Sequence, residues 1–185
     1  MKRILVSICV AAIALAIVAT GAYSNFTVED SAENVVTTGS IDFEIHEVMD
    51  DGKKFPVNGI EVMPGDVVGK TVTVENTSNH PLFLRVKLVK GVEGNSLPAD
   101  NQLQVDINTT DWTLKDGYYY YNKELKAHEE TEPLFTKVSV DGPSVTYEYI
   151  GLSFLLDVKG YAVQSENNSD SPLTALGWPE DKTVN

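Results

Sequence analysis

The residues that could bind a metal or transfer a proton are few, and they are widely spaced along the chain. His46, His80 and His128 lie far apart in sequence. Glu132 stands four residues after His128, where the zinc-protease pattern on a helix has its second histidine. This segment has no helical period, so it is expected to form an acidic surface loop. We therefore expect no catalytic residue, no metal and no cofactor.

Lys70 is the best candidate for a nucleophile. The chain has neither a Gly-x-Ser-x-Gly turn nor a glycine-rich phosphate loop. Lys70 shares the alternation of Val68, Val72 and Val74 and so falls on the apolar face of its strand. Burial would lower the pKa of its amine, which could then condense with an asparagine or aspartate beside a carboxylic acid. In the alternative, Lys70 lies at a sheet edge with its stem packed and its amine in water.

The tyrosine run at residues 118–121 could stack on a sugar or on a partner protein. Alternating tyrosines in a strand would also simply pack on one side and cover the sheet on the other. A surface adhesion module therefore remains one of the alternatives for function.

The first residues have the three parts of a secretory signal. Lys2 and Arg3 precede an apolar run over residues 4–20, and small residues follow at Ala22 and Ser24. The run is shorter than the roughly 20 residues of a spanning helix. We predict a signal peptide over residues 1–24, cleaved between Ser24 and Asn25, and a secreted protein of the extracellular matrix or cell surface.

Cysteine and charge narrow the function classes. Cys9 is the single cysteine and lies within the predicted signal, so the mature chain would have no disulfide and no thiol nucleophile. The formal net charge is −13, and it becomes more negative when the basic residues of the signal are removed. Such a surface repels nucleic acid and anionic lipid. We expect no nucleic-acid partner, and contact with membrane only through the uncleaved signal.

Short alternating segments separated by turn residues predict an all-β fold. Alternation is seen in residues 36–48, 68–75, 82–89, 103–107 and 138–140, and residues 118–121 are aromatic and prone to form a strand. Residues 68–75 and 82–89 flank a turn-rich stretch and look like the two strands of a hairpin. Residues 147–163 form the longest β-like tract, with a break or bulge expected at Gly151 and Gly160. These features predict an antiparallel sandwich of the jelly-roll type.

Motifs spread along most of the chain resemble the TasA/camelysin family. They are residues 21–26 followed by 39–43, Met63-Pro64-Gly65-Asp66 followed by Lys70 and residues 74–79, residues 84–87, Trp112, residues 115–121, residues 130–135, and residues 162–168 before Gly177-Trp178-Pro179. Members are exported proteins of Gram-positive bacteria that are processed by a SipW-type signal peptidase. The sequence is most similar to the BsaA-like biofilm matrix proteins of clostridia, which form pilus-like polymers.

The resemblance implies a jelly-roll domain, here residues 39–185, that assembles into extracellular fibres with copies of itself. In such fibres the N-terminal segment of one subunit adds as a strand to the next subunit. Residues 25–38 suit this role, with Phe26, Val28, Val35 and Val36 as β-prone positions. We expect this donor segment to lack a partner within its own chain and to pair with a neighbour's sheet edge.

The family also implies an alternative function, because its camelysin branch is described as a metalloprotease. The sequence supplies no recognisable zinc constellation, so no protease residue is assigned. The favoured reading is a structural subunit that is not an enzyme.

Overall fold

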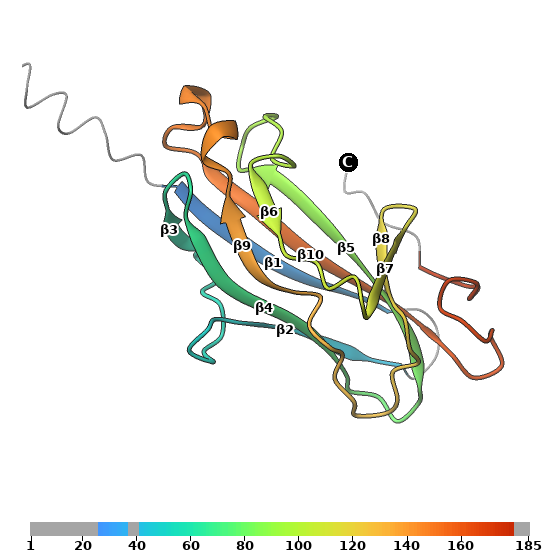
Figure 1. Cartoon of the computed structure of the whole chain (residues 1–185). Coiled ribbons are helices and arrows are strands. Elements are labelled where there is room, and N and C mark those ends of the chain that lie inside the picture. The colour runs from blue at the N-terminus through green and yellow to red at the C-terminus, as the bar shows by residue number, and fades with distance from the viewer. Residues whose placement is uncertain (1–25, 37–40, 180–185) are drawn as a thin grey trace, which may run out of the picture.

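The computed structural model describes residues 41–179 and, as backbone only, residues 26–36. These residues form a sandwich of two β-sheets (Figure 1). The strands are β1 (Phe26–Val36), β2 (Phe43–Val48), β3 (Ile60–Val62), β4 (Val67–Asn76), β5 (Leu82–Val92), β6 (Leu103–Val105), β7 (Trp112–Lys115), β8 (Tyr118–Tyr121), β9 (Phe135–Val140) and β10 (Ser153–Gln164). The 3₁₀ helices η1 (Gly142–Ser144) and η2 (Tyr147–Tyr149) connect β9 to β10.

One sheet has the strand order β3-β1-β10-β5-β8-β7 and the other has the order β2-β4-β9-β6. All neighbouring strands are antiparallel except β1 and β10, which run parallel. The prediction of an all-β sandwich is therefore confirmed. The parallel pair was not anticipated from the sequence.

The predicted hairpin of residues 68–75 and 82–89 is wrong. These residues form β4 and β5, which belong to opposite sheets. Asn76 explains why the chain turns a corner here: its side-chain amide donates to the carbonyl groups of His80, Leu125 and Lys126. Its side-chain oxygen accepts from the N–H and the hydroxyl of Ser78. A loop held by these bonds crosses between the layers instead of folding back into a two-strand ladder.

The core lies between the sheets and is built from the alternating faces that the sequence predicts. Val72 and Val74 of β4 face Leu84 and Val86 of β5, and all four side chains are fully buried. Alternation with period two places every second residue of a strand on the same face. The core therefore confirms the predicted inward faces of both strands.

The long β-like tract at residues 147–163 divides differently from the prediction. Its first part forms η2, and β10 begins after Gly151, whose φ of 76° suits glycine. Gly160 neither breaks nor bulges β10, since the ladder to β5 runs in continuous register through it. A Cβ atom at Gly160 would lie 2.5 Å from Cε2 of Phe43. The glycine is needed for close approach of the opposite sheet.

No helix among the described residues is long and apolar enough to cross a membrane. The predicted signal peptide and cleavage position, residues 1–25, lie outside the described residues, as do residues 37–40.

Candidate assembly site

The predicted donor segment forms β1, which lies between β10 and β3 in the six-stranded sheet. Its register with β10 is continuous from Thr27 opposite Ser153 to Val36 opposite Ala162. On the other side, Phe26 to Val28 pair with Val62 to Ile60 of β3. The backbone of residues 26–36 therefore pairs with strands of its own chain. The expectation that this segment lacks an intramolecular partner is wrong for this structure.

The residues assigned to the donor segment fall at both ends of β1. Phe26 and Val28 align with Val62 and Ile60 of β3, where β1 begins. Val35 and Val36 align with Tyr161 and Ala162 near the end of β10. The middle of β1 reads Glu29-Asp30-Ser31-Ala32-Glu33-Asn34. Aspartate and asparagine are depleted in strands, and glutamate and alanine less so, and thus the central segment has little strand propensity of its own.

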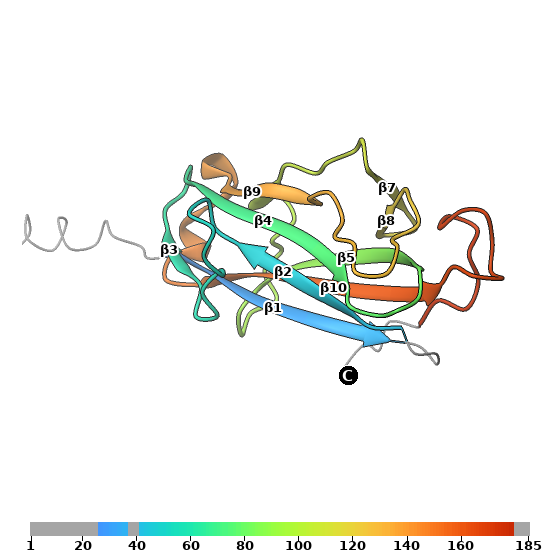
Figure 2. The same cartoon turned by 90° about the horizontal axis from the view of Figure 1, so that it is seen from below.

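Most of β1 is paired on one side only. Beyond Val28 it has no strand neighbour on the β3 side within the part of the chain that the structure describes. Figure 2 shows β1 along the side of the sandwich, running opposite to β2 of the other sheet. To leave its sheet, β1 has to break the ladder to β10 and the three-residue pairing with β3.

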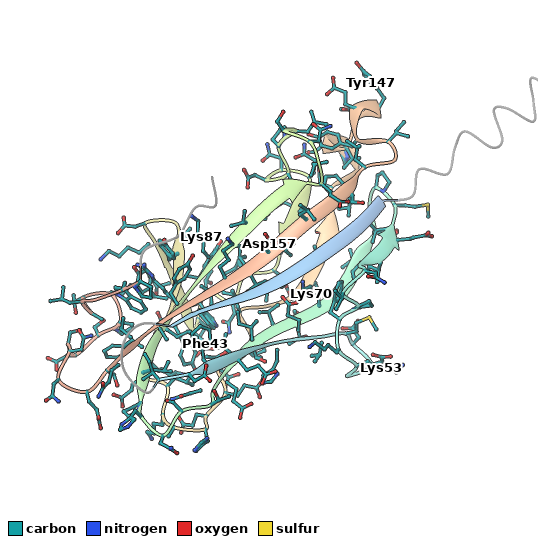
Figure 3. The ribbon with its side chains drawn as sticks, turned by 180° about the vertical axis from the view of Figure 1, so that it is seen from behind. Phe43, Lys53, Lys70, Lys87, Tyr147 and Asp157 are labelled. Carbon is teal, nitrogen blue, oxygen red and sulfur yellow. The ribbon has the colours of Figure 1, made fainter. Side chains whose placement is uncertain are left out.

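Lys70 lies in the interior of the sandwich. The alternative, a lysine at a sheet edge with its amine in water, is therefore wrong. Its side chain is fully buried, and its Nζ atom lies 3.3 Å from Oε1 of Glu47, whose side chain is only 7% exposed. The ring of Phe55 has its centroid 4.6 Å from the same Nζ atom. Figure 3 shows Lys70 in the space between the two sheets. The prediction of a buried lysine beside a carboxylate agrees with this geometry, while the isopeptide bond itself stays a prediction.

The backbone around Lys70 is irregular in a way that positions the side chain. In the ladder between β4 and β9 the register shifts between Gly69 and Val72, which marks a β-bulge. Bulges redirect a side chain and are common beside functional sites. Gly69 lies against the Asp50 carboxylate, and a Cβ atom there would lie 2.1 Å from Cγ of Asp50. A side chain at Gly69 would require the exposed Asp50 side chain to move.

The histidines lie apart and have separate partners. His46 pairs with Glu75 at 3.0 Å, and His80 lies 3.7 Å from Glu166. In residues 41–179, no three His, Cys, Asp or Glu side chains come together as metal ligands. The donors described here therefore do not fit a zinc site of the metalloprotease type, which needs at least three protein ligands.

Arg85 organises the tyrosine run, a role that the sequence analysis missed. Its guanidinium carbon lies 3.9 Å from the ring centroid of Tyr118 and 4.8 Å from that of Trp178. Nη1 donates to the hydroxyl of Tyr120 at 3.2 Å, and Nη2 donates to the carbonyl of Pro179 at 3.0 Å. These contacts attach the segment after β10 to the outer face of the sheet. The alternation of β5 does place Arg85 outward, but nothing local points to Trp178.

The tyrosine side chains of residues 118–121 pack largely against other residues of the same molecule. Tyr120 and Tyr121 are buried, and Tyr118 and Tyr119 are half-buried. The packing interpretation of this run therefore fits the structure better than an open binding face.

Comparison with known proteins identifies the family to which the chain belongs. The model of the camelysin metallo-endopeptidase family matches residues 1–117, a span that includes the donor segment, Glu47 and Lys70. No curated protein and no solved structure matches the chain. The match covers more than half of the sequence, and it agrees with the motifs found along the chain. The chain thus belongs to the camelysin/TasA family of exported proteins.

Proposed function

We propose that this protein is a secreted structural subunit of extracellular biofilm-matrix fibres, and that it polymerises by exchange of β1 between neighbouring copies. The observation that carries the proposal is the position of β1, a strand that runs parallel to β10 and is held mainly by the one ladder to it. An identical β1 from another copy fits the same place, since its register partners are the same. Family membership supports the reading, because TasA members are structural.

Processing by a SipW-type signal peptidase would set when exchange begins. While the signal is attached, the start of β1 is tethered to the membrane, and cleavage between Ser24 and Asn25 would release it. A released monomer keeps β1 in its own sheet. Exchange then replaces one β1–β10 ladder by an equal ladder between subunits, so little enthalpy separates the two states and high local concentration favours the polymer.

A disulfide lock tests the exchange directly. Ser31 of β1 aligns with Asp157 of β10, and the mature chain would have no other cysteine because Cys9 lies in the predicted signal. Aligned residues on paired strands lie within the distance that a disulfide can span. In the variant Ser31→Cys/Asp157→Cys, oxidation before assembly should prevent filaments, and reduction should restore them, as seen by electron microscopy.

Oxidation after assembly gives the complementary result. The same variant should then run as a ladder of disulfide-linked chains on non-reducing gels, whereas each single cysteine variant should not. Filaments in which every disulfide lies within one chain would contradict strand exchange, because β1 would never have left its own sheet.

The alternative is a secreted metalloprotease, as the family's name suggests. Described residues do not assemble zinc ligands, so we place this function second. Metal analysis and casein cleavage by the purified mature protein separate the two functions. Stoichiometric zinc together with cleavage that a chelator stops would favour the protease.

A surface adhesion module is the third candidate. A ligand could bind in a depression of about 440 Å³ at the end of β10, which is lined by Val163, Gln164, Leu176 and neighbouring polar residues. A saturable carbohydrate or protein ligand for the monomer would favour it.

A further inference from the structure

The short strand β3 holds the beginning of β1 in the sheet. Thr27 and Val28 of β1 pair with β10 on one side and with β3 on the other. From Glu29 to Val36, β1 pairs with β10 alone among the described residues. β3 lies beside the start of β1 (Figures 1 and 2), and within the described part of the chain β1 is its one strand neighbour. β1 therefore cannot leave the sheet while its pairing with β3 is intact.

The backbone can change direction on both sides of β3. Gly59 precedes the strand with a φ of 70°, and Gly65 follows it with a φ of 96°. Both angles lie in the region that favours glycine. Apart from the chain neighbours of Gly65, nothing lies within 4 Å of where its Cβ atom would be. Hinges are a few residues at the ends of elements that absorb changes in φ and ψ. We call the segment between the two glycines, residues 60–64, the latch.

The chain is anchored outside the latch at both ends. On the N-terminal side, Phe55 is buried and its N–H donates to the carbonyl of Glu47 at 2.8 Å. On the C-terminal side, the N–H of Gly65 donates to the carbonyl of Val140 at 2.7 Å, and the N–H of Val140 donates to the carbonyl of Asp66 at 3.0 Å. The latch can therefore move while both sheets keep their own contacts.

The latch itself has few contacts with the body of the sandwich. Val62 is 3% exposed and belongs to the core, and Ile60 is half-buried against it. Glu61 and Met63 are exposed. In the described part of the chain, the backbone hydrogen bonds of the latch outside its pairing with β1 join Met63 to Asp66. Segments with few buried contacts open at a lower free energy than the core, so the side chain of Val62 is the main contact that opposes opening.

We propose that the latch rotates about Gly59 and Gly65 to release or admit β1, and that this opening controls the rate of strand exchange. Residues 29–36 of β1 can separate from β10 while the latch is closed, whereas Thr27 and Val28 can leave only when it opens. A copy of β1 from another subunit pairs first from its Val36 end, and the latch then closes over its first residues. This role in fibre growth rests on the proposed strand exchange, but the opening of the latch in a monomer does not.

Hydrogen exchange in the monomer tests the latch with a pair of matched valine variants. Val62 and Val138 are buried in the same core, but Val138 lies on β9, whose neighbours are β4 and β6. In Val62→Ala, the protected amides of β1 should exchange about tenfold faster than in the wild type, because less apolar surface opposes opening. In Val138→Ala, the amides of β1 should exchange as in the wild type. NMR of the dilute mature protein resolves the individual amides.

Equal acceleration of β1 exchange in the two valine variants would overturn the latch, because β1 would then open only with the whole molecule. Unchanged β1 exchange in Val62→Ala would overturn it as well. The comparison holds even if both variants lose overall stability, since it rests on the difference between β1 and the other strands.

A pair of glycine variants tests the hinge. Gly117, in the turn between β7 and β8, has a φ of 80°, and the space around its missing Cβ is as open as at Gly65. Alanine is strained at both positions. Opening relieves this strain only at a hinge, so Gly65→Ala should speed the exchange of the β1 amides by about fivefold or more, and Gly117→Ala should leave it unchanged. Wild-type β1 exchange in Gly65→Ala would overturn Gly65 as a hinge.

The latch and the fibre function fail in distinguishable ways. Monomers in which Val62→Ala alone speeds β1 exchange, but which never give filaments, would support the latch and overturn the fibre function. Wild-type filaments that form by strand exchange, together with β1 exchange that is equal in the two valine variants, would overturn the latch and leave the fibre function standing. If both proposals hold, Val62→Ala filaments should also release subunits on dilution faster than Val138→Ala filaments.

Discussion

At the scale of single residues, close approach between the sheets depends on Gly160. Its missing Cβ would lie 2.5 Å from Cε2 and 3.0 Å from Cζ of Phe43, and 3.3 Å from Cδ1 of Ile45. Both neighbours are buried and have little room to move. Gly160 therefore acts through packing, not through an unusual backbone angle.

We predict that Gly160→Ala destabilises the protein by about 1–3 kcal/mol through overpacking. This corresponds to about 2–4 °C in melting temperature per kcal/mol for a chain of this size. Gly91→Ala is the matched control on the adjacent strand, because its Cβ would meet only Leu155 Cβ at 4.0 Å. Thermal unfolding followed by circular dichroism checks both. Equal stability of the two variants would contradict the role assigned to Gly160.

Asp106 is a second residue whose contacts predict a measurable effect. It accepts hydrogen bonds from the N–H groups of Thr136 and Lys137 at 2.8 and 2.6 Å, and from the Thr136 hydroxyl at 2.7 Å. Partial burial raises the pKa of Asp106, but the hydrogen bonds outweigh it and the pKa lies below its ordinary value.

Because the pKa of Asp106 is lower in the folded chain, its stabilisation is full above about pH 4 and is lost as the pH falls through the folded-state value. Asp106→Asn should lower stability at neutral pH by about 0.5–1 kcal/mol, a figure already reduced for solvent screening. It should also flatten the acid-side decline. Urea unfolding from pH 7 down to pH 3 measures this. Asp170→Asn makes the same substitution at another exposed position and is the control.

At the scale of elements, β1 combines low strand propensity with a single long ladder. Its acidic centre gains strand structure from β10, whose inner face is a nearly continuous apolar surface from Phe154 to Ala162. The place of β1 in the sheet is therefore defined by β10 and β3, and the proposed exchange requires only that a second copy of β1 pairs with the same two strands.

Deleting residues 25–36 from the mature chain should abolish filaments, because no strand is left to donate, while the remaining strands keep a sandwich fold. A synthetic peptide of residues 25–36 should bind this truncated chain and raise its melting temperature, since a ligand stabilises the folded state it binds. A peptide of the same composition in scrambled order is the control. Filaments from the truncated chain would show that assembly uses another surface.

At the scale of the whole molecule, the net charge of −13 would oppose the proposed assembly. Subunits with the same strong charge repel one another, and salt screens this repulsion. The Debye length falls from about 30 Å at 0.01 M to about 8 Å at 0.15 M ionic strength.

Filament growth should therefore be faster at 0.15 M than at 0.01 M sodium chloride, as followed by light scattering and confirmed by electron microscopy. The oxidised Ser31→Cys/Asp157→Cys variant should give no scattering at either concentration, which separates fibre growth from salting out. Growth that slows with added salt would mean that attraction between opposite charges guides the subunits.

The sequence alone determined the class of fold, the inward faces of β4 and β5, and the family resemblance. Period-two alternation and turn residues are local properties, and each strand's buried face follows from them directly. The family motifs are equally local, and the family match agrees with them. Lys70 was found by the same alternation, because a lysine on an apolar face is visible without any structure.

Only the tertiary structure decided which strands became neighbours and what each site contains. The turn between β4 and β5 leads from one sheet to the other because Asn76 is bonded to residues about fifty positions away. β1 pairs in parallel with β10, and Lys70 of β4 contacts Glu47 of β2. Such contacts join distant parts of the chain through packing between layers, and no local pattern encodes them.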